Sequence, residues 1–251
     1  MCTVVVEVPT SPSEAVRLLA VRDEDPARPW DPPGPWWRER PGVVGVRDRR
    51  AGGAWLAASP TQGRLSVILN RPDIYSQGIP SPSNGLASRG ALVLDAVADR
   101  SLPNPLRTAG FNLVSVDGRR VVVTSWDGEA LMREELEPGM HMIAHHDVDD
   151  PRSARIESWL PEFRSLAGLE EHWRESWLAL LGRSAELPSD DDRAIIRDNR
   201  GHGYETLSLL VCTAEVRRGG ESGVAARGHV RLESATLAQP AVWDAPVFRS
   251  A

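Results

Sequence analysis

The second residue of the chain is a cysteine, and this position can give one residue two reactive groups. Met1 followed by a small side chain is the usual substrate for removal of an initiator methionine. Cys2 would then carry a thiol with a reference pKa of about 8.5 and a free α-amine with a pKa of about 7.7–8.0. A nucleophile and a general base held together are the arrangement of N-terminal nucleophile catalysis. Cys2 therefore predicts a cysteine nucleophile, and the alternative is a cysteine at position 2 by chance.

Arg22, Asp23 and Glu24 form a charged group directly after the apolar run 16–21. Charges beside a buried strand are costly unless they are exposed or have a role. Arg22 can stabilise a Cys2 thiolate or pair with a substrate carboxylate or an oxyanion, whereas Asp23 can hold the α-amine by a hydrogen bond. Adjacent strand residues face opposite ways, so both side chains reach Cys2 only where the strand ends or bulges. The alternative is a solvated charge cluster.

Histidines and aspartates between residues 141 and 150 resemble a metal site in composition. On a strand, His141 and His145 share one face while His146 takes the other. We predict that the group is structural or solvated and holds no metal, with a Zn²⁺ site or a haem axial ligand as the alternative. The group consists of His141, His145, His146, Asp147, Asp149 and Asp150.

The composition excludes several classes of function. The chain has 251 residues, 29 of them basic and 35 acidic, for a net charge of −6. Every basic residue is arginine, which excludes a P-loop lysine and Schiff-base chemistry. The acidic balance excludes a nucleic-acid partner, and no apolar run is long enough for a membrane span. An N-terminus without signal features and only two cysteines predict a cytoplasmic protein.

The first half of the chain is typical of short strands with one helix. Strands are expected at 2–8 and 16–21, joined as a hairpin that brings Cys2 close to the end of the second strand. Residues 25–42 are rich in proline and tryptophan and predict a loop, either covering the edge of the core or serving as a lid. Further strands are expected at 54–58 and 64–69, a second loop at 71–88, and an amphipathic helix at 89–99.

The second half contains the clearest β signal. Asp-Gly pairs separate the alternating runs 111–116, 121–126 and 129–136, which predicts consecutive hairpins. Later elements are a strand at 140–145, helices at 168–182 and 190–198 (the latter with Ser189 as N-cap), and strands at 206–216, 224–232 and 241–248. This order is not that of a βαβ fold and favours antiparallel sheets with helices on their outer faces. We expect a single domain over 1–251.

Six motifs occur in the order and at the spacing of one protein family. They are MCTVVVEV at 1–8, AVRDEDPARP at 20–29, GGAWLAAS at 52–59, LSVILN at 65–70, SRGAL at 88–92 and GFNLVSVD at 110–117. The chain resembles the NRDE family, the group that contains the transport-and-Golgi-organisation protein 2 proteins. The resemblance is dense over 1–117 and loose beyond.

The resemblance implies an N-terminal nucleophile hydrolase fold, an α+β four-layer αββα sandwich of antiparallel sheets. In that superfamily the leading cysteine attacks an amide carbonyl and its own amine shuttles the proton. Matching positions give these roles to Cys2, Arg22 and Asp23. Asn70 and Asn112 match asparagines of the family pattern, and an asparagine can donate to an oxyanion, contact substrate or cap a turn. Arg89 matches an Arg-Gly pair before the helix and is either an anion contact or a surface charge.

Three departures from the family pattern affect these expectations. The opening asparagine of the Asn-Arg-Asp-Glu motif is Val21 here. Where the family has a Ser-Asn pair, this chain has Ala144 and His145, so His145 must supply any oxyanion contact made there. Glu205 stands where the family has an arginine, and the loss of positive charge would change which acyl group or anion fits.

Two functions follow as hypotheses. The first is a cysteine-nucleophile amidohydrolase or acyltransferase that acts on a non-peptide C–N or thioester bond of a small metabolite, with no cofactor. The second is a non-catalytic protein on the same scaffold that binds haem, an acyl-CoA or a lipid for trafficking. Both hypotheses expect a small-molecule ligand or substrate.

Overall fold

The computed structural model describes residues 2–11, 13–79, 85–169, 171–217 and 228–251 and divides the chain into two compact units. Unit 1 comprises Met1–Arg28, Glu137–Glu215 and Leu232–Ser250, and unit 2 comprises Pro29–Leu136, Val216–Arg231 and Ala251. The single domain expected over 1–251 stays a prediction.

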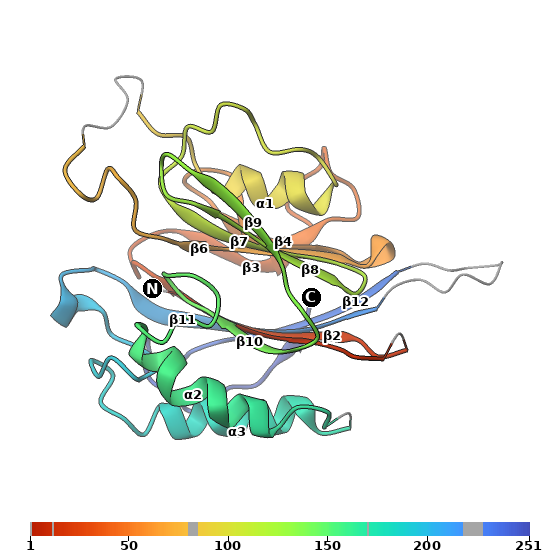
Figure 1. Cartoon of the computed structure of the whole chain (residues 1–251), viewed down its shortest axis with the longest axis vertical. Coiled ribbons are helices and arrows are strands. Elements are labelled where there is room, and N and C mark those ends of the chain that lie inside the picture. Colours follow the sequence, from red (N-terminus) through yellow and green to blue (C-terminus); the bar gives the residue numbers. More distant parts are fainter. Residues whose placement is uncertain (1, 12, 80–84, 170, 218–227) are drawn as a thin grey trace. The chain divides into compact units, whose positions relative to one another are not determined.

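Unit 1 is built on a six-stranded sheet in the order β10-β1-β2-β11-β12-β13 (Figure 1). The central strands are valine-rich and buried, which suits β-branched side chains to a pleated surface. β1 pairs antiparallel with both β2 and β10. The strands are β1 (Thr3–Val8), β2 (Val16–Glu24), β10 (Gly139–Ile143), β11 (Leu207–Arg217), β12 (His229–Thr236) and β13 (Arg249–Ser250).

Two helices, α2 (Ala154–Ser165) and α3 (Trp173–Ser184), cover one face of this sheet (Figure 1). Their apolar sides share a core with Val5, Leu19 and Met142 of the sheet. At its centre Trp177 is fully buried and meets the rings of Phe163 and Trp173 edge to face. Edge-to-face contacts add to the stability from apolar burial, so this cluster holds the helices on the sheet.

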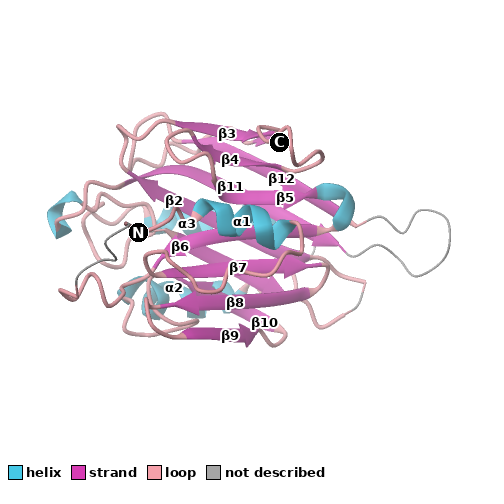
Figure 2. Cartoon of the chain, turned by 90° about the horizontal axis from the view of Figure 1, so that it is seen from above, coloured by secondary structure: helices cyan, strands magenta, loops and turns pink. Residues whose placement is uncertain are grey.

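Unit 2 is built on a seven-stranded antiparallel sheet in which the strands follow one another in sequence order, with helix α1 (Gly90–Val97) along one face (Figure 2). Leu92, Val93 and Val97 of α1 are buried, as the helical pattern predicts. The strands are β3 (Trp30–Gly34), β4 (Val44–Asp48), β5 (Ala54–Ser59), β6 (Arg64–Asn70), β7 (Phe111–Asp117), β8 (Arg120–Trp126) and β9 (Leu131–Glu135). Single 3₁₀ turns lie at Pro60–Gln62 and, in unit 1, at Arg200–His202.

Two of the sequence motifs meet where α1 crosses the start of β5. A Cβ atom added to Gly53 would lie 2.5 Å from the backbone of Gly90, and one added to Gly90 would lie 2.9 Å from the nitrogen of Ala54. No real side chain tolerates such distances, so both positions need glycine. The glycines of GGAWLAAS and SRGAL therefore serve helix packing.

The helix expected at 190–198 is wrong, because this segment is a loop of turns. Asp191 accepts hydrogen bonds from both the backbone N–H and the guanidinium of Arg193. Asp198 makes the same two contacts with Arg200. Aspartate side chains that bond the backbone two residues ahead favour turns over helix, and Asp191 and Asp198 act in this way.

Other elements also differ from expectation. The strand expected at 241–248 is absent among the described residues, because Ala241 and Ala245 have positive φ angles, and the paired residues are only Arg249–Ser250. Residues 224–227 of the strand expected at 224–232 lie outside the described residues. The expected loop 25–42 contains β3. Two further elements were not predicted, the strand β4 and the helix α2, and α2 has Pro161 inside it.

Candidate active site

Cys2 lies level with Arg22 because the first two strands form the predicted antiparallel hairpin. Thr3 pairs with Val21 in this ladder, so the next positions outward are Cys2 and Arg22. Side chains alternate between the two faces of a strand, so the Asp23 side chain takes the face opposite to that of Arg22. The hairpin thus brings Cys2, Arg22 and Asp23 into one neighbourhood.

The Cys2 sulfur contacts the main chain of Asp23. The Asp23 N–H donates to Cys2 Sγ at 3.4 Å, and the Sγ–Asp23 carbonyl oxygen distance is 3.6 Å. Cys2 is 8% exposed. Burial is the main reason that the pKa of its thiol is raised, and the Asp23 charge raises this pKa further. The Asp23 N–H and Arg22 lower the pKa by smaller amounts. The resting group is therefore a thiol, which needs a base before it can act as a nucleophile.

The Asp23 carboxylate is buried, and both of its oxygens accept hydrogen bonds. Ser208 Oγ donates to Oδ1 at 2.6 Å, and Asn199 Nδ2 donates to Oδ2 at 3.1 Å. Asp23 is only 7% exposed, so these bonds replace the water that a carboxylate requires. Two donors on two different elements fix the position of the Asp23 carboxylate, whose charge acts on the Cys2 thiol.

Asn199 and Ser208 were not identified from the sequence. They lie 176 and 185 residues from Asp23 along the chain. Asn199 stands in a polar loop and Ser208 at the start of β11, and neither has a motif around it that indicates a site. Only the folded chain brings them to Asp23.

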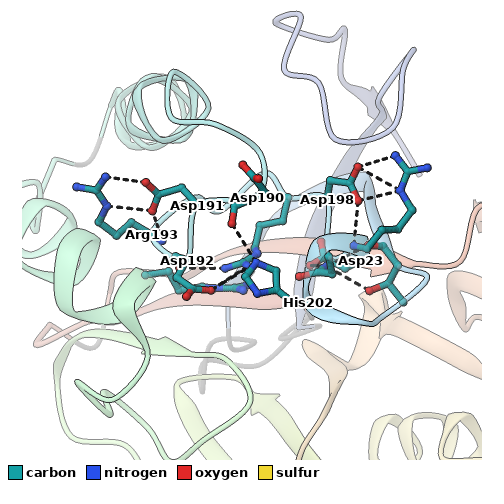
Figure 3. Close-up of polar contacts among 12 residues, drawn as sticks. Asp23, Asp190, Asp191, Asp192, Arg193, Asp198 and His202 are labelled. Carbon is teal, nitrogen blue, oxygen red and sulfur yellow. Dashed lines mark hydrogen bonds and ion pairs between the residues drawn. The ribbon is translucent and has the colours of Figure 1, made fainter.

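A network of ion pairs orders the loop 190–206 that carries Asn199 (Figure 3). Arg197 is buried, and its guanidinium donates to Asp192 through both the backbone oxygen and the carboxylate. The Arg197 N–H donates to Ser208 Oγ at 2.8 Å. Asn199 Nδ2 also bonds the Thr206 carbonyl, which closes the loop next to β11. The loop therefore holds Asn199 in place for Asp23.

Three buried arginines belong to the site. Arg22 donates to Glu24 at 3.1 Å, and Arg155 of α2 donates to Thr3 Oγ1 at 2.8 Å. Burial lowers the pKa of Arg155 to about 10, so this side chain is still charged at neutral pH. Arg197 is the third, and it pairs with Asp192 at 3.1 Å. Guanidinium groups in such a position can contact an anionic ligand or a developing oxyanion.

His145 is half-buried just after β10. Burial lowers its pKa to about 4, helped by the positive charges of His146, Arg155 and others, so the ring is neutral at neutral pH. Its ring lies against that of His146, tilted by 47° with centroids 4.1 Å apart, and its Nδ1 has no hydrogen-bond partner among the described residues. A neutral ring can donate one hydrogen bond, and the oxyanion role expected of His145 stays a prediction.

The other expected site residues are Asn70, Asn112, Arg89 and Glu205. Asn70 is exposed at the end of β6, and Asn112 is buried in β7, where its Oδ1 accepts from Ser125 at 2.8 Å. Arg89 donates to the Gly110 carbonyl at 2.8 Å and so ties the start of α1 to the start of β7. All three belong to unit 2. Glu205 belongs to unit 1 and is exposed.

The His–Asp group at 141–150 is occupied by ion pairs. His141 bonds Asp149 at 2.9 Å, Asp149 also pairs with Arg164, and Asp150 pairs with Arg152. Within the described ranges, no cluster of three or more histidine, cysteine or acidic residues can hold a metal ion. No helix in the same part of the chain is long and apolar enough to cross a membrane.

The described residues form an α+β fold of two antiparallel sheets, with α2 and α3 against one face of the first sheet and α1 against one face of the second. A family model for Transport and Golgi organisation 2 matches residues 1–207, and the chain belongs to this family, which is the NRDE family. Among solved structures, the chain is similar to a Caenorhabditis elegans N-acylethanolamine-hydrolyzing acid amidase (NAAA) ortholog, with 11% identity and a TM-score of 0.48 over 84% of this chain and 92% of that one. No curated protein matches the sequence.

Proposed function

We propose that the protein is an N-terminal-cysteine amidohydrolase or acyltransferase that acts on a non-peptide C–N or thioester bond of a small metabolite. The observation that supports this most is the contact of Cys2 Sγ with the Asp23 N–H, beside an Asp23 carboxylate held by Ser208 and Asn199. A catalytic sulfur needs such a fixed polar frame, because reaction requires the attacking atom to be held in place.

The proposed reaction starts from the thiol. Removal of Met1, which lies outside the described residues, frees the α-amine of Cys2 to take the thiol proton. Cys2 Sγ then forms a bond to the carbonyl carbon, and the C–N or C–S bond breaks as the proton passes to the leaving group. Water, or an acceptor amine in a transferase, attacks the resulting thioester and restores the thiol. The arginines around Cys2 suit the negative charge on the carbonyl oxygen.

Intact-mass spectrometry with a reactive ester, p-nitrophenyl acetate, tests this proposal. The mature protein should lack Met1 and gain one acetyl group, and Cys2→Ala should gain none while keeping its circular dichroism spectrum. Cys212→Ala is the matched control, because Cys212 is fully buried in β11, and it should be acetylated like the wild type. A chain that retains Met1, or a Cys2→Ala protein that is still acetylated, would refute the mechanism.

One observation favours the second function, binding of haem without catalysis. His145 is neutral at neutral pH, and its Nδ1 makes no hydrogen bond to the described residues. Neutral imidazole is a common iron ligand, so His145 is the residue that would hold haem. The haem iron would supply ligand binding and redox chemistry. Haemin should then give a Soret shift that His145→Ala removes, and no shift at micromolar haemin would reject this function.

A further inference from the structure

A cavity in unit 2 is built from none of the residues of the candidate active site. It has a volume of about 320 Å³ and lies between the end of α1, the segment that follows this helix, and strands β7, β8 and β9. In Figure 2, α1 runs along the β5–β6 side of the sheet face, and β7–β9 lie beside it. We call this cavity the α1 groove. Its size is within the usual range for a small-molecule site.

The floor of the α1 groove is one row of side chains across the sheet. The register places Leu113 opposite Thr124 and Ser115 opposite Val122. These four side chains line the groove as neighbours on one face. The floor therefore offers two hydroxyl groups between branched apolar groups, and Leu131 and Leu102 extend the apolar lining at the sides.

The rim of the α1 groove carries four arginines and two aspartates, in a chain whose net charge is −6. Arg64 is paired with Asp99 and Asp117, at 3.1 and 3.3 Å. Arg120 is paired with Glu135 at 2.7 Å. The four arginines and two aspartates of the lining are Arg64, Arg100, Arg120, Arg133, Asp99 and Asp117.

Two of these arginines are available to a ligand. Arg133 on the edge strand β9 makes no hydrogen bond or ion pair to any residue that the structure describes. Arg100 has its nearest carboxylate, that of Asp95, at 3.9 Å, which is beyond hydrogen-bond distance. A guanidinium that makes no hydrogen bond can form two parallel ones with a carboxylate or a phosphate. The groove thus joins an anion contact to a short apolar channel.

We propose that the α1 groove is a binding site for a small molecule with one anionic headgroup, a carboxylate or a phosphate, on a short apolar chain. Arg133 and Arg100 hold the headgroup, and the apolar chain lies over Leu113 and Val122 against Leu131. A purely apolar ligand leaves Arg133 without a partner, and a bare anion leaves the exposed Leu131 in water, so both bind more weakly.

Isothermal titration calorimetry of the full chain with four probes tests this site. Octanoate or octyl phosphate should bind with a dissociation constant on the order of 0.1 mM. Octanol and inorganic phosphate should each bind at least about tenfold more weakly, because each lacks one half of the recognition. Tighter binding of octanoate assigns a carboxylate headgroup, and tighter binding of octyl phosphate assigns a phosphate.

Two variants connect binding to the α1 groove. Arg133→Gln should weaken binding of the better probe about tenfold, and Leu131→Ser about threefold. Arg119→Gln is the matched control, since Arg119 is exposed in the β7–β8 turn and does not line the groove. All three positions are exposed, so the circular dichroism spectra should be unchanged. Failure of both amphiphiles to bind, or equal binding by Arg133→Gln and Arg119→Gln, would overturn the proposal.

Discussion

Replacement of Ser208 by alanine tests whether the Asp23 carboxylate depends on its two donors. Ser208 is fully buried, and its hydroxyl makes two contacts at once. It donates to Asp23 Oδ1 at 2.6 Å and accepts from the Arg197 N–H at 2.8 Å. Ser208→Ala removes one oxygen atom and no other packing, so its effect reports on these two bonds.

The expected loss follows from the two bonds. A hydrogen bond to a charged group contributes about 1.5–3 kcal/mol, and a buried N–H left without a partner costs about 1–3 kcal/mol. Asp23 keeps the bond from Asn199, so the carboxylate does not lose all of its support. We therefore expect Ser208→Ala to lower the free energy of unfolding by about 2–5 kcal/mol.

Urea unfolding followed by tryptophan fluorescence measures this loss, with Ser66→Ala as the matched control. Ser66 is equally buried, in β6 of unit 2, but its hydroxyl donates only to the neutral Ser115 hydroxyl at 3.3 Å. Its replacement should cost about 1 kcal/mol or less. Equal losses for Ser208→Ala and Ser66→Ala would show that Asp23 does not depend on Ser208, and the frame described around Cys2 would be wrong.

Three further predictions concern other parts of unit 1. The hydrogen bond to Asp149 raises the pKa of His141. Protonated His141 therefore stabilises the fold fully below the unfolded-state pKa of about 6.5, and this contribution is lost as the pH rises through the folded-state pKa. The difference in unfolding free energy between wild type and His141→Gln should shrink from pH about 5.5 to about 8.5, and a constant difference would contradict this. Trp177→Ala should lower the free energy of unfolding by about 3–5 kcal/mol, because Trp177 is fully buried among other rings. Urea titration measures this loss, and a loss below about 1 kcal/mol would refute the packing described for Trp177. Burial raises the pKa of Cys212 to about 12, so its thiol should not react in the native protein. In a Cys2→Ala background, mass spectrometry should show that iodoacetamide at neutral pH labels the protein only after unfolding. Labelling of the native protein would contradict the burial of Cys212.

Local patterns in the sequence predict most of the individual elements. The valine run at the N-terminus, the Asp-Gly turns between β7, β8 and β9, and the apolar face of α1 depend only on neighbouring residues. The hairpin of β1 and β2 is also local, so the position of Cys2 beside Arg22 follows from the sequence. The predictions from the sequence fail at two kinds of segment. In 190–198, aspartate side chains take the backbone N–H groups that a helix would need, and at Ala241 a positive φ angle interrupts an apolar run.

The family, the sheet-forming segments and the leading cysteine with its charged pair could all be predicted, because each depends on residues close together along the chain. The surroundings of Asp23 and the position of the α1 groove could not be predicted in this way. A buried carboxylate must find donors wherever the fold supplies them, and Asn199 and Ser208 arrive from a loop and a strand far along the chain. No spacing rule connects such residues, because their distance in space is set by the packing of whole elements.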